Sequence, residues 1–308
     1  MLNEQYFTSA DKVTEVRFVG NVPQNPMAVI AIAHGIGEYA GRYGEMAKIF
    51  AERGIAVYAI DFIGHGCSIS DNKAPMYFGE DGWEFLVQDL LTFNRLVKKA
   101  HPDIPCIMLG FSMGSFVLRE AMFKYANEID ADGAILAGTG RISGFVATLV
   151  RKMLESEAKK CGGADKVSEK VNELAFGGYN KFFTPCKTDF DWLCKNEEGI
   201  QSYIEDQFTN KFITPGMFSD LLGSMARTSK KSAIKHTKKI PILFISGKED
   251  PVGGFVKEVA KVVEEFKKYN SDVTFMTYDE TRHDLFHDND KEVVMEDVYN
   301  WIKWVIKR

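Results

Sequence analysis

The pentapeptide Gly110-Phe111-Ser112-Met113-Gly114 places a serine between two glycines at a spacing that suits nucleophilic catalysis. It lies between residues 104–109, an apolar run that predicts a short buried strand, and residues 115–126, which predict a helix. At such a turn the serine backbone is strained and its hydroxyl is exposed beyond the end of the strand. The pattern alone is weak evidence, so its interpretation depends on the partners available to Ser112.

A serine hydroxyl is a poor nucleophile unless a base takes its proton and a carboxylate orients that base. Asp250 follows the apolar run of residues 241–246 through a turn that contains glycine, and His283 follows residues 273–278 before the last helix. The carboxyl ends of parallel strands meet at one edge of a sheet, where ligands bind. We therefore predict Ser112 as nucleophile, His283 as general base and Asp250 as the orienting acid.

Each of these assignments has an alternative. Ser112 could cap the helix that follows it, and Asp250 could only form a turn, with Asp279 or Glu249 as the acid. His287, four residues after the predicted base, is a second candidate for that role. The remaining histidines are of a kind that is more often structural, and their spacing does not suit a metal: His34, His65, His101 and His236.

An acyl-transfer mechanism also needs two N–H groups that stabilise the oxyanion. Met113, directly after the serine, is predicted to supply one of them. Ile36 is predicted to supply the other, because it follows the strand of residues 27–33 in a loop where glycines allow close approach to a carbonyl. The alternative is that His34-Gly35 only ends that strand.

Short apolar strands alternate with amphipathic helices over most of the chain, which predicts a mainly parallel sheet with helices on both faces. The predicted strands are residues 13–19 at an edge, 27–33, 55–60, 104–109, 132–137, 241–246 and 273–278. The predicted helices are residues 38–53, 82–100, 115–126, 254–269 and 291–307.

Residues 139–239 break this alternation. They are locally helical and aromatic, and they contain 17 Lys and Arg against 12 Asp and Glu. We therefore predict a core of residues 1–138 and 240–308, with residues 139–239 inserted as a cap over the C-terminal edge of the sheet.

Composition excludes several classes of protein. Hydrophobic residues make up 45% and charged residues 26% of the 308 residues, as in a globular protein with a sizeable core. A net charge of −5 argues against a nucleic-acid-binding protein. No signal-peptide pattern opens the chain and no run of 18 apolar residues occurs. Five scattered cysteines favour free thiols and a cytoplasmic protein. We predict no metal and no cofactor, and the oligomeric state stays open.

Several motifs together resemble the monoacylglycerol lipase and lysophospholipase family of α/β-hydrolases. They are His34-Gly35-Ile36-Gly37-Glu38, Gly41-Arg42-Tyr43, residues 61–68, the pentapeptide, residues 247–252 and Thr281-Arg282-His283-Asp284. The resemblance covers residues 25–305 and extends into the insertion at residues 176–181 and 188–193, which look like those of bacterial members. Residues 194–196 and 206–207 depart from such relatives, which leaves the substrate preference open.

The resemblance implies an α/β-hydrolase fold and the same catalytic and oxyanion positions that are predicted above. It further implies hydrolysis of a monoacylglycerol, a lysophospholipid or a similar ester through an acyl-enzyme, with transient contact at a membrane surface. Alternatives on the same residues are an aminopeptidase like proline iminopeptidase, a thioesterase, an esterase for small aromatic acids, or a non-catalytic binding protein. A dehalogenase would need Asp at position 112 and is excluded.

One apolar stripe in the insertion bears on the substrate. It consists of Ile142, Phe145, Val146, Leu149 and Met153, which share one face of a predicted helix. The stripe either packs onto the core or forms an acyl-binding site above Ser112. For the second case we predict that Phe145, Leu149 and Met153 contact the substrate.

Overall fold

The computed structural model describes residues 3–69, 74–209 and 212–308. These residues form one eight-stranded sheet with the strand order β1-β2-β4-β3-β5-β6-β7-β8. The strands from β4 to β8 in that order are parallel, and β1 and β2 are antiparallel to their neighbours. The strands are β1 (Asn3–Thr8), β2 (Glu15–Asn21), β3 (Ala28–Ala33), β4 (Ile55–Ile60), β5 (Cys106–Phe111), β6 (Gly133–Ala137), β7 (Ile242–Gly247) and β8 (Val273–Tyr278).

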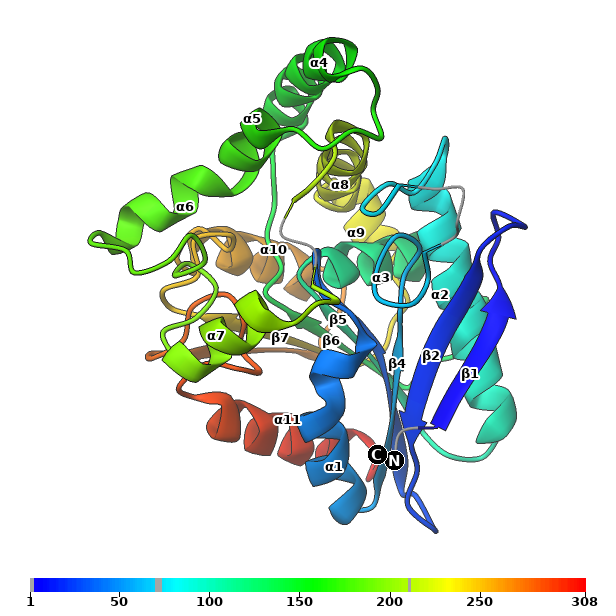
Figure 1. The fold of residues 1–308 in the computed structure, drawn as a ribbon. Helices are drawn as coiled ribbons and strands as arrows, with labels where there is room; N and C mark the ends of the chain where they lie inside the picture. Colours follow the sequence, from blue (N-terminus) through cyan, green and yellow to red (C-terminus); the bar gives the residue numbers. More distant parts are fainter. Residues whose placement is uncertain (1–2, 70–73, 210–211) are drawn as a thin grey trace.

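Helices cover both faces of the sheet (Figure 1). Helices α1 (Gly44–Glu52) and α11 (Lys291–Val305) enclose one hydrophobic core. Helices α2 (Gly82–Ala100), α3 (Met113–Lys124) and α10 (Lys257–Lys267) enclose the other. Every residue of the five strands from β3 to β7 is buried, because each is an apolar run that faces helices on both sides.

The fold class predicted from the sequence is therefore confirmed, with two local corrections. The strand predicted at residues 13–19 is β2, and it is not an edge, because β1 pairs outside it. Most residues of β1 are exposed, so that strand lacks the hydrophobic alternation by which a strand is recognised. The first helix begins at Gly44, after a 3-10 turn η1 (Ala40–Tyr43), rather than directly after residue 38.

The chain between β6 and β7 is mostly helical, and its helices α4 to α6 rise above the sheet in Figure 1. We call residues 139–239 the insertion. Its helices are α4 (Gly144–Cys161), α5 (Glu169–Asn172), η2 (Glu173–Gly177), α6 (Gly178–Asn180), η3 (Lys181–Phe183), α7 (Glu197–Glu205), α8 (Pro215–Thr228) and α9 (Lys231–His236). Helix α8 packs against both α4 and the core helix α3.

None of the helices within the described residues combines the length and the apolar character that crossing a membrane requires.

Candidate active site

Ser112 occupies the single residue between the end of β5 and the start of α3. Its φ of 48° lies in the left-handed region that side chains other than glycine rarely adopt, so the backbone is strained there. The strain is held in place by a hydrogen bond from the Ser112 N–H to the Ala137 carbonyl of β6, at 2.9 Å. The sharp turn directs the side chain beyond the end of the strand.

The two glycines of the pentapeptide are required by close packing. A Cβ on Gly110 would lie 2.6 Å from the carbonyl oxygen of Gly114. A Cβ on Gly114 would overlap the carbonyl oxygen of Ala33 in β3. The start of α3 therefore lies too close to β5 and to the end of β3 for a larger residue at either position.

The structure brings the three predicted catalytic residues into one chain of hydrogen bonds. Ser112 Oγ lies 2.9 Å from His283 Nε2, and His283 Nδ1 lies 3.0 Å from Asp250 Oδ2. The other oxygen of Asp250 accepts a hydrogen bond from the Val252 N–H at 2.8 Å. Asp250 is fully buried, and only 8% of Ser112 and 2% of His283 is exposed.

Two opposing effects act on His283. Burial lowers the pKa of the imidazole, but the adjacent Asp250 carboxylate raises it, and the net result is a pKa above the ordinary value of 6.5. Because the carboxylate stays beside Nδ1, it stabilises the charged imidazolium that forms when the ring accepts a proton. This is the electrostatic environment that a general base for serine needs.

The alternative residues lie elsewhere. Asp279 is exposed and pairs with Lys248 at 2.5 Å, and Glu249 pairs with Lys195 at 2.6 Å. His287 contacts Asp284 through Nδ1 at 2.8 Å and the Arg42 carbonyl through Nε2 at 3.1 Å. Of the candidates considered from the sequence, His283 is the one hydrogen-bonded to Ser112, and Asp250 is the one hydrogen-bonded to His283.

The predicted oxyanion residues flank the serine. Ile36 lines the same cavity as Ser112, and Met113 is the first residue of α3. Within the described part of the chain, the N–H groups of Ile36 and Met113 donate to no acceptor. Both are therefore available to a substrate oxygen.

The loop that carries Ile36 is held by buried polar groups. Glu38 Oε1 accepts hydrogen bonds from the Gly35 N–H at 2.6 Å and from the Tyr43 hydroxyl at 2.8 Å. His34 Nε2 accepts from the Phe62 N–H at 3.0 Å. Burial lowers the pKa of His34 to about 4, so its ring is neutral near pH 7 and accepts this bond. The sequence indicated the motif of residues 34–38 but did not predict that Glu38 and His34 hold the loop.

One cavity, of about 390 Å³, is lined mainly by residues of the insertion and does not include Ser112. A second cavity, of about 290 Å³, opens over Ser112 and His283. Apart from Ser112, Arg141 and His283, the lining of the second cavity is made of apolar, aromatic and glycine residues. These are Ile36, Phe116, Ile142, Val150, Leu174, Ala175, Phe176, Gly178, Tyr179, Trp192, Phe218, Leu221, Leu222, Met225 and Val252. Most of them come from the insertion, so this part of the chain shapes the space around the reacting atoms.

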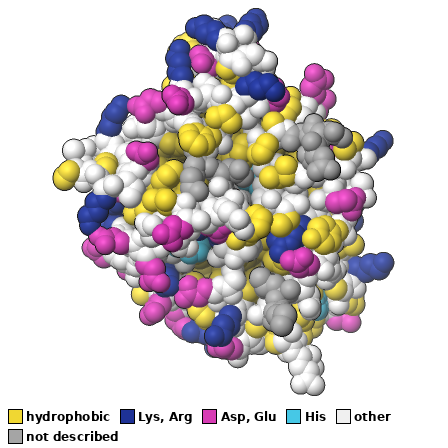
Figure 2. Space-filling model, in the orientation of Figure 1, with side chains coloured by type: hydrophobic (Ala, Val, Ile, Leu, Met, Phe, Trp, Pro, Cys, Tyr) yellow, Lys and Arg dark blue, Asp and Glu magenta, His cyan; other side chains and the backbone are white. Residues whose placement is uncertain are grey.

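The predicted substrate contacts from α4 do not line this cavity. Phe145, Leu149 and Met153 are 82%, 54% and 49% exposed. The correction follows from how α4 is turned: its face with Ala147 is buried, because α4 packs against α8, and Val150 is the α4 residue that reaches the cavity. In Figure 2 the tip of the molecule over α4 carries Lys and Arg side chains, close to hydrophobic ones.

Sequence reasoning missed an aromatic wall beside the base. The centre of the Trp192 ring lies 5.4 Å from that of the His283 ring, and the ring of Phe176 stacks on Trp192 with centres 5.3 Å apart. Both residues fall within motifs of the insertion that supported the family resemblance. The resemblance pointed to these segments of the insertion, but it did not indicate that they contact His283.

No group of three or more His, Cys, Asp or Glu side chains suited to a metal ion occurs among the described residues.

Comparisons with known proteins bear on the family and the fold of the chain. The profile of the family described as "Serine aminopeptidase, S33" matches residues 24–290. A monoacylglycerol lipase of Mycolicibacterium smegmatis is 27% identical over 306 residues, covering 97% of this chain and 96% of that protein. A phospholipase of Bacillus subtilis is 23% identical and covers 88% of this chain and 93% of its own length. A thermostable carboxyl esterase of Bacillus coagulans has the same fold, with a TM-score of 0.90 at 24% identity over 99% of both chains.

Proposed function

This chain belongs to the serine aminopeptidase S33 family, and from that premise we propose that it hydrolyses lipid-like carboxylic esters through an acyl-enzyme. The observation that carries the proposal is the hydrogen-bonded chain of Asp250, His283 and Ser112 below an apolar cavity of about 290 Å³. The names of the two sequence relatives, a monoacylglycerol lipase and a phospholipase, support the same class of substrate.

In the acylation half-reaction, His283 Nε2 takes the proton of Ser112 as Oγ attacks the ester carbonyl. The N–H groups of Ile36 and Met113 stabilise the negative charge on the carbonyl oxygen. Asp250 holds the ring and stabilises its charged form. The tetrahedral intermediate then collapses: the bond to the leaving oxygen breaks, and the imidazolium donates its proton to the departing alcohol.

Deacylation repeats these steps with water. Neutral His283 removes a proton from a water molecule, whose oxygen attacks the acyl carbon. When the bond to Ser112 Oγ breaks, the imidazolium returns the proton to the serine. The carboxylic acid leaves, and no metal or organic cofactor is required for either half-reaction.

The lining of the cavity favours an ester over a peptide, although the family is described as an aminopeptidase. A peptidase that binds a free α-amino group needs a carboxylate near the scissile bond. Among the described residues that line this cavity, none is Asp or Glu. Its one arginine, Arg141, is paired with Glu258 at 3.4 Å. An apolar acyl chain meets these walls without burying an unpaired charge.

We further propose that the insertion acts as the cap of this site and that its tip meets lipid surfaces transiently. The exposed apolar side chains of α4 lie on the same helix as Arg151 and Lys152, which suits an interface with anionic lipid (Figure 2). All five cysteines have free thiols, which supports the prediction of a reducing, cytoplasmic location.

Substitution of the nucleophile tests the proposed mechanism. Ser112→Ala removes Oγ, so hydrolysis of p-nitrophenyl butyrate should fall by about 10⁴-fold or more while the fold is kept. Ser143→Ala, which removes only the hydroxyl that caps α4, is the matched control and should keep its activity. Retained esterase activity of purified Ser112→Ala would refute the mechanism.

The substrate class is tested with the wild-type protein on monoacylglycerol, a lysophospholipid and an aminoacyl anilide. We expect turnover of at least one lipid ester and none of the anilide. Preferential cleavage of the anilide would support the peptidase instead.

A further inference from the structure

The residues that carry the base have no regular secondary structure of their own. His283 lies in the segment between β8 and α11, residues 279–290, which we call the base loop. A general base must stay within hydrogen-bond reach of the hydroxyl that it deprotonates, and a misplacement of about 1 Å can reduce the rate about 100-fold. Something outside the loop must therefore hold it.

Asp288 is the residue around which the base loop is fastened. Its side chain is fully buried and faces four backbone N–H groups. Two of them belong to the base loop, those of Arg282 at 2.7 Å and Asn289 at 2.9 Å. The other two belong to the insertion, those of Lys195 at 2.7 Å and Asn196 at 3.1 Å. One carboxylate thus joins two segments that are 92 and 93 residues apart in the sequence.

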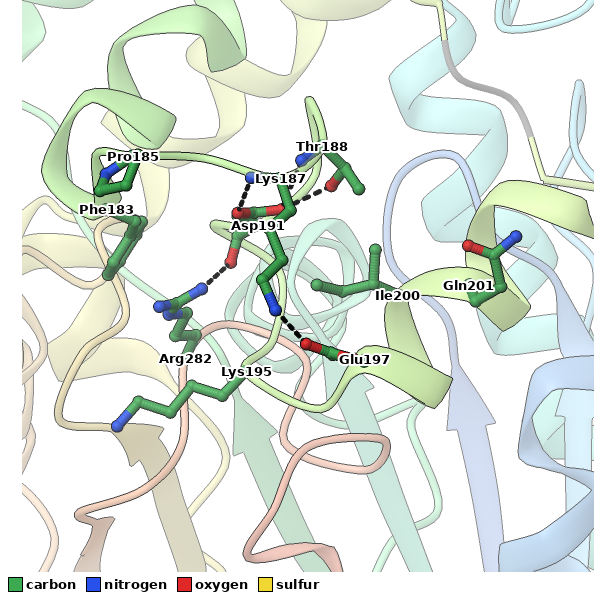
Figure 3. Close-up of a pocket in the computed structure, with 10 residues that line it drawn as sticks. All are labelled: Phe183, Pro185, Lys187, Thr188, Asp191, Lys195, Glu197, Ile200, Gln201 and Arg282. Carbon is green, nitrogen blue, oxygen red and sulfur yellow. Dashed lines mark hydrogen bonds and ion pairs between the residues drawn. The ribbon is translucent and has the colours of Figure 1, made fainter.

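Further contacts cross the same junction on both sides of His283. The Asp284 N–H donates to the Leu193 carbonyl at 2.6 Å. The Arg282 guanidinium donates to the Asp191 carbonyl at 2.5 Å and lies over the ring of Phe183 at 3.9 Å. Figure 3 shows Arg282 reaching from the base loop to Asp191 beside that ring. The residues directly before and after the base are both bonded to the insertion.

The bonds between the base loop and the insertion also determine where Trp192 lies. This residue lies inside the fastened segment of the insertion, and its ring packs 5.4 Å from the imidazole of His283. The imidazole is therefore set from two directions, by Asp250 at Nδ1 and by the insertion across the face of the ring.

A carboxylate matches the four N–H donors better than an amide does. Burial raises the pKa of Asp288, and the hydrogen bonds from these N–H groups act in the opposite direction. Both of its oxygens accept, Oδ1 from three N–H groups and Oδ2 from the N–H of Arg282. An asparagine has one accepting oxygen, so its NH₂ group would face at least one N–H donor in a buried place. Asp288→Asn therefore loosens the junction with almost no change in side-chain volume.

We propose that Asp288 is a positioning residue for the reaction: by joining the base loop to Lys195 and Asn196 it keeps His283 aligned with Ser112. The inference rests on the proposed function of His283 as general base. It also assigns the insertion a part in aligning the base, in addition to lining the cavity.

The test uses ethyl p-nitrophenyl hexylphosphonate, which reports positioning and folding separately. Ser112 Oγ forms a bond to phosphorus, p-nitrophenolate leaves, and the serine proton passes to His283. The amount of nitrophenolate released counts the competent sites, and the rate constant reports how well the base activates the serine. For Asp288→Asn we expect a rate constant about 10- to 100-fold lower, with the count per folded chain unchanged.

Asp290→Asn is the matched control. Asp290 accepts from the Glu280 N–H at 2.9 Å and the Thr281 hydroxyl at 3.0 Å, both within the base loop. The rate constant of the Asp290→Asn variant should stay within about threefold of the wild-type value, because this substitution changes no bond to the insertion. If Asp288→Asn lowers only the count of sites and keeps the wild-type rate constant, its role is structural and the proposal is wrong. If the wild-type protein does not react, or Ser112→Ala reacts equally fast, the proposed function has failed instead.

A second pair of variants tests the proposal should Asp288→Asn not fold. The backbone φ of Asn196 is −68°, which proline also adopts, so Asn196→Pro removes one N–H that Asp288 accepts. Asn196→Ala keeps that N–H and loses only the side chain that caps α7. We expect a rate constant several-fold lower for the proline variant than for the alanine variant. Equal rate constants would overturn the proposal.

Discussion

At the scale of the residue, the proposed role of His283 depends on the groups that surround it. His283 is almost fully enclosed, with Asp250 at one nitrogen, Ser112 at the other and Trp192 against its face. Burial alone would disfavour the charged ring, but the carboxylate outweighs it and raises the pKa of His283 above 6.5. Both proton transfers of the proposed mechanism depend on this balance.

The raised pKa predicts how activity depends on pH. The base must be neutral to accept the serine proton, so activity is lost as pH falls through the pKa of His283. Because that pKa is raised, the acidic limb of kcat/KM should lie above pH 6.5. The measurement is kcat/KM for p-nitrophenyl butyrate between pH 5 and 9. His236→Gln, at an exposed histidine, should leave the limb in place. A limb below pH 6.5 would contradict the assignment of the environment of His283.

The same shift has the opposite effect on stability. A histidine whose pKa is higher in the folded protein stabilises the fold below the unfolded value of about 6.5. That contribution is lost as pH rises through the pKa of the folded protein. The contribution of His283 to the free energy of unfolding should therefore decrease over the pH range in which kcat/KM increases.

At the scale of the element, α3 connects the nucleophile to both ends of the insertion. Arg119 is buried, and its guanidinium donates to the Gly140 carbonyl at 2.8 Å, before α4, and to the Thr228 carbonyl at 2.9 Å, at the end of α8. Next to it, Glu120 binds Arg227 of α8 through two bonds, at 2.9 and 3.0 Å. Burial lowers the pKa of Arg119 to about 9, which still leaves it charged at neutral pH.

Arg119→Lys tests this connection. Lysine keeps the charge, but its single ammonium group cannot reach the partners that the guanidinium fork bridges. Leaving a buried carbonyl unpaired should lower the free energy of unfolding by about 2 kcal/mol. Urea denaturation measures the change. Arg95→Lys, at an exposed arginine of α2, should change it by less than about 0.5 kcal/mol. An equal effect of the two substitutions would show that Arg119 does not hold the insertion.

At the scale of the whole molecule, the substrate cavity lies between two parts of the chain with different tasks. The core, residues 1–138 and 240–308, supplies Ser112, Asp250, His283 and the loop of Ile36, whereas the insertion supplies most of the apolar walls. Bonds through Asp288 and through Arg119 join the two parts at separate places. We therefore expect substrate preference to depend on how the insertion packs onto the core.

An apolar cavity predicts that activity depends on the length of the acyl chain. A p-nitrophenyl ester series should show activity that rises from acetyl to longer chains as apolar surface is buried, at about 0.8 kcal/mol for each CH₂ group. Leu222→Trp fills the cavity from α8 and should shift the optimum to shorter chains. Met153→Trp, on the exposed face of α4, should leave the optimum unchanged. Activity that stays flat from acetyl to long chains would contradict an acyl-binding cavity.

The sequence by itself determined most of the sheet and the positions of Ser112, Asp250 and His283 at the ends of strands. Apolar runs predict buried strands because they state locally which residues avoid water, and the glycines around Ser112 mark a turn that no larger residue permits. Ser112, Asp250 and His283 each follow a strand, and parallel strands bring their carboxyl ends to the same edge of the sheet. Where this local signal is weak, as in the exposed strand β1, the sequence predicted nothing.

Only the tertiary structure decided which residues surround the reacting atoms. Apolar residues repeat at the same helical spacing whether a face of α4 meets the cavity or the solvent. The sequence pattern therefore could not show that Val150 lines the cavity while Phe145, Leu149 and Met153 are exposed. The contacts of Asp288 and Trp192 with residues about 90 positions away leave no periodicity in either segment. Packing of the insertion onto the core selects them, because a side chain's partners depend on the whole fold rather than on its neighbours in sequence.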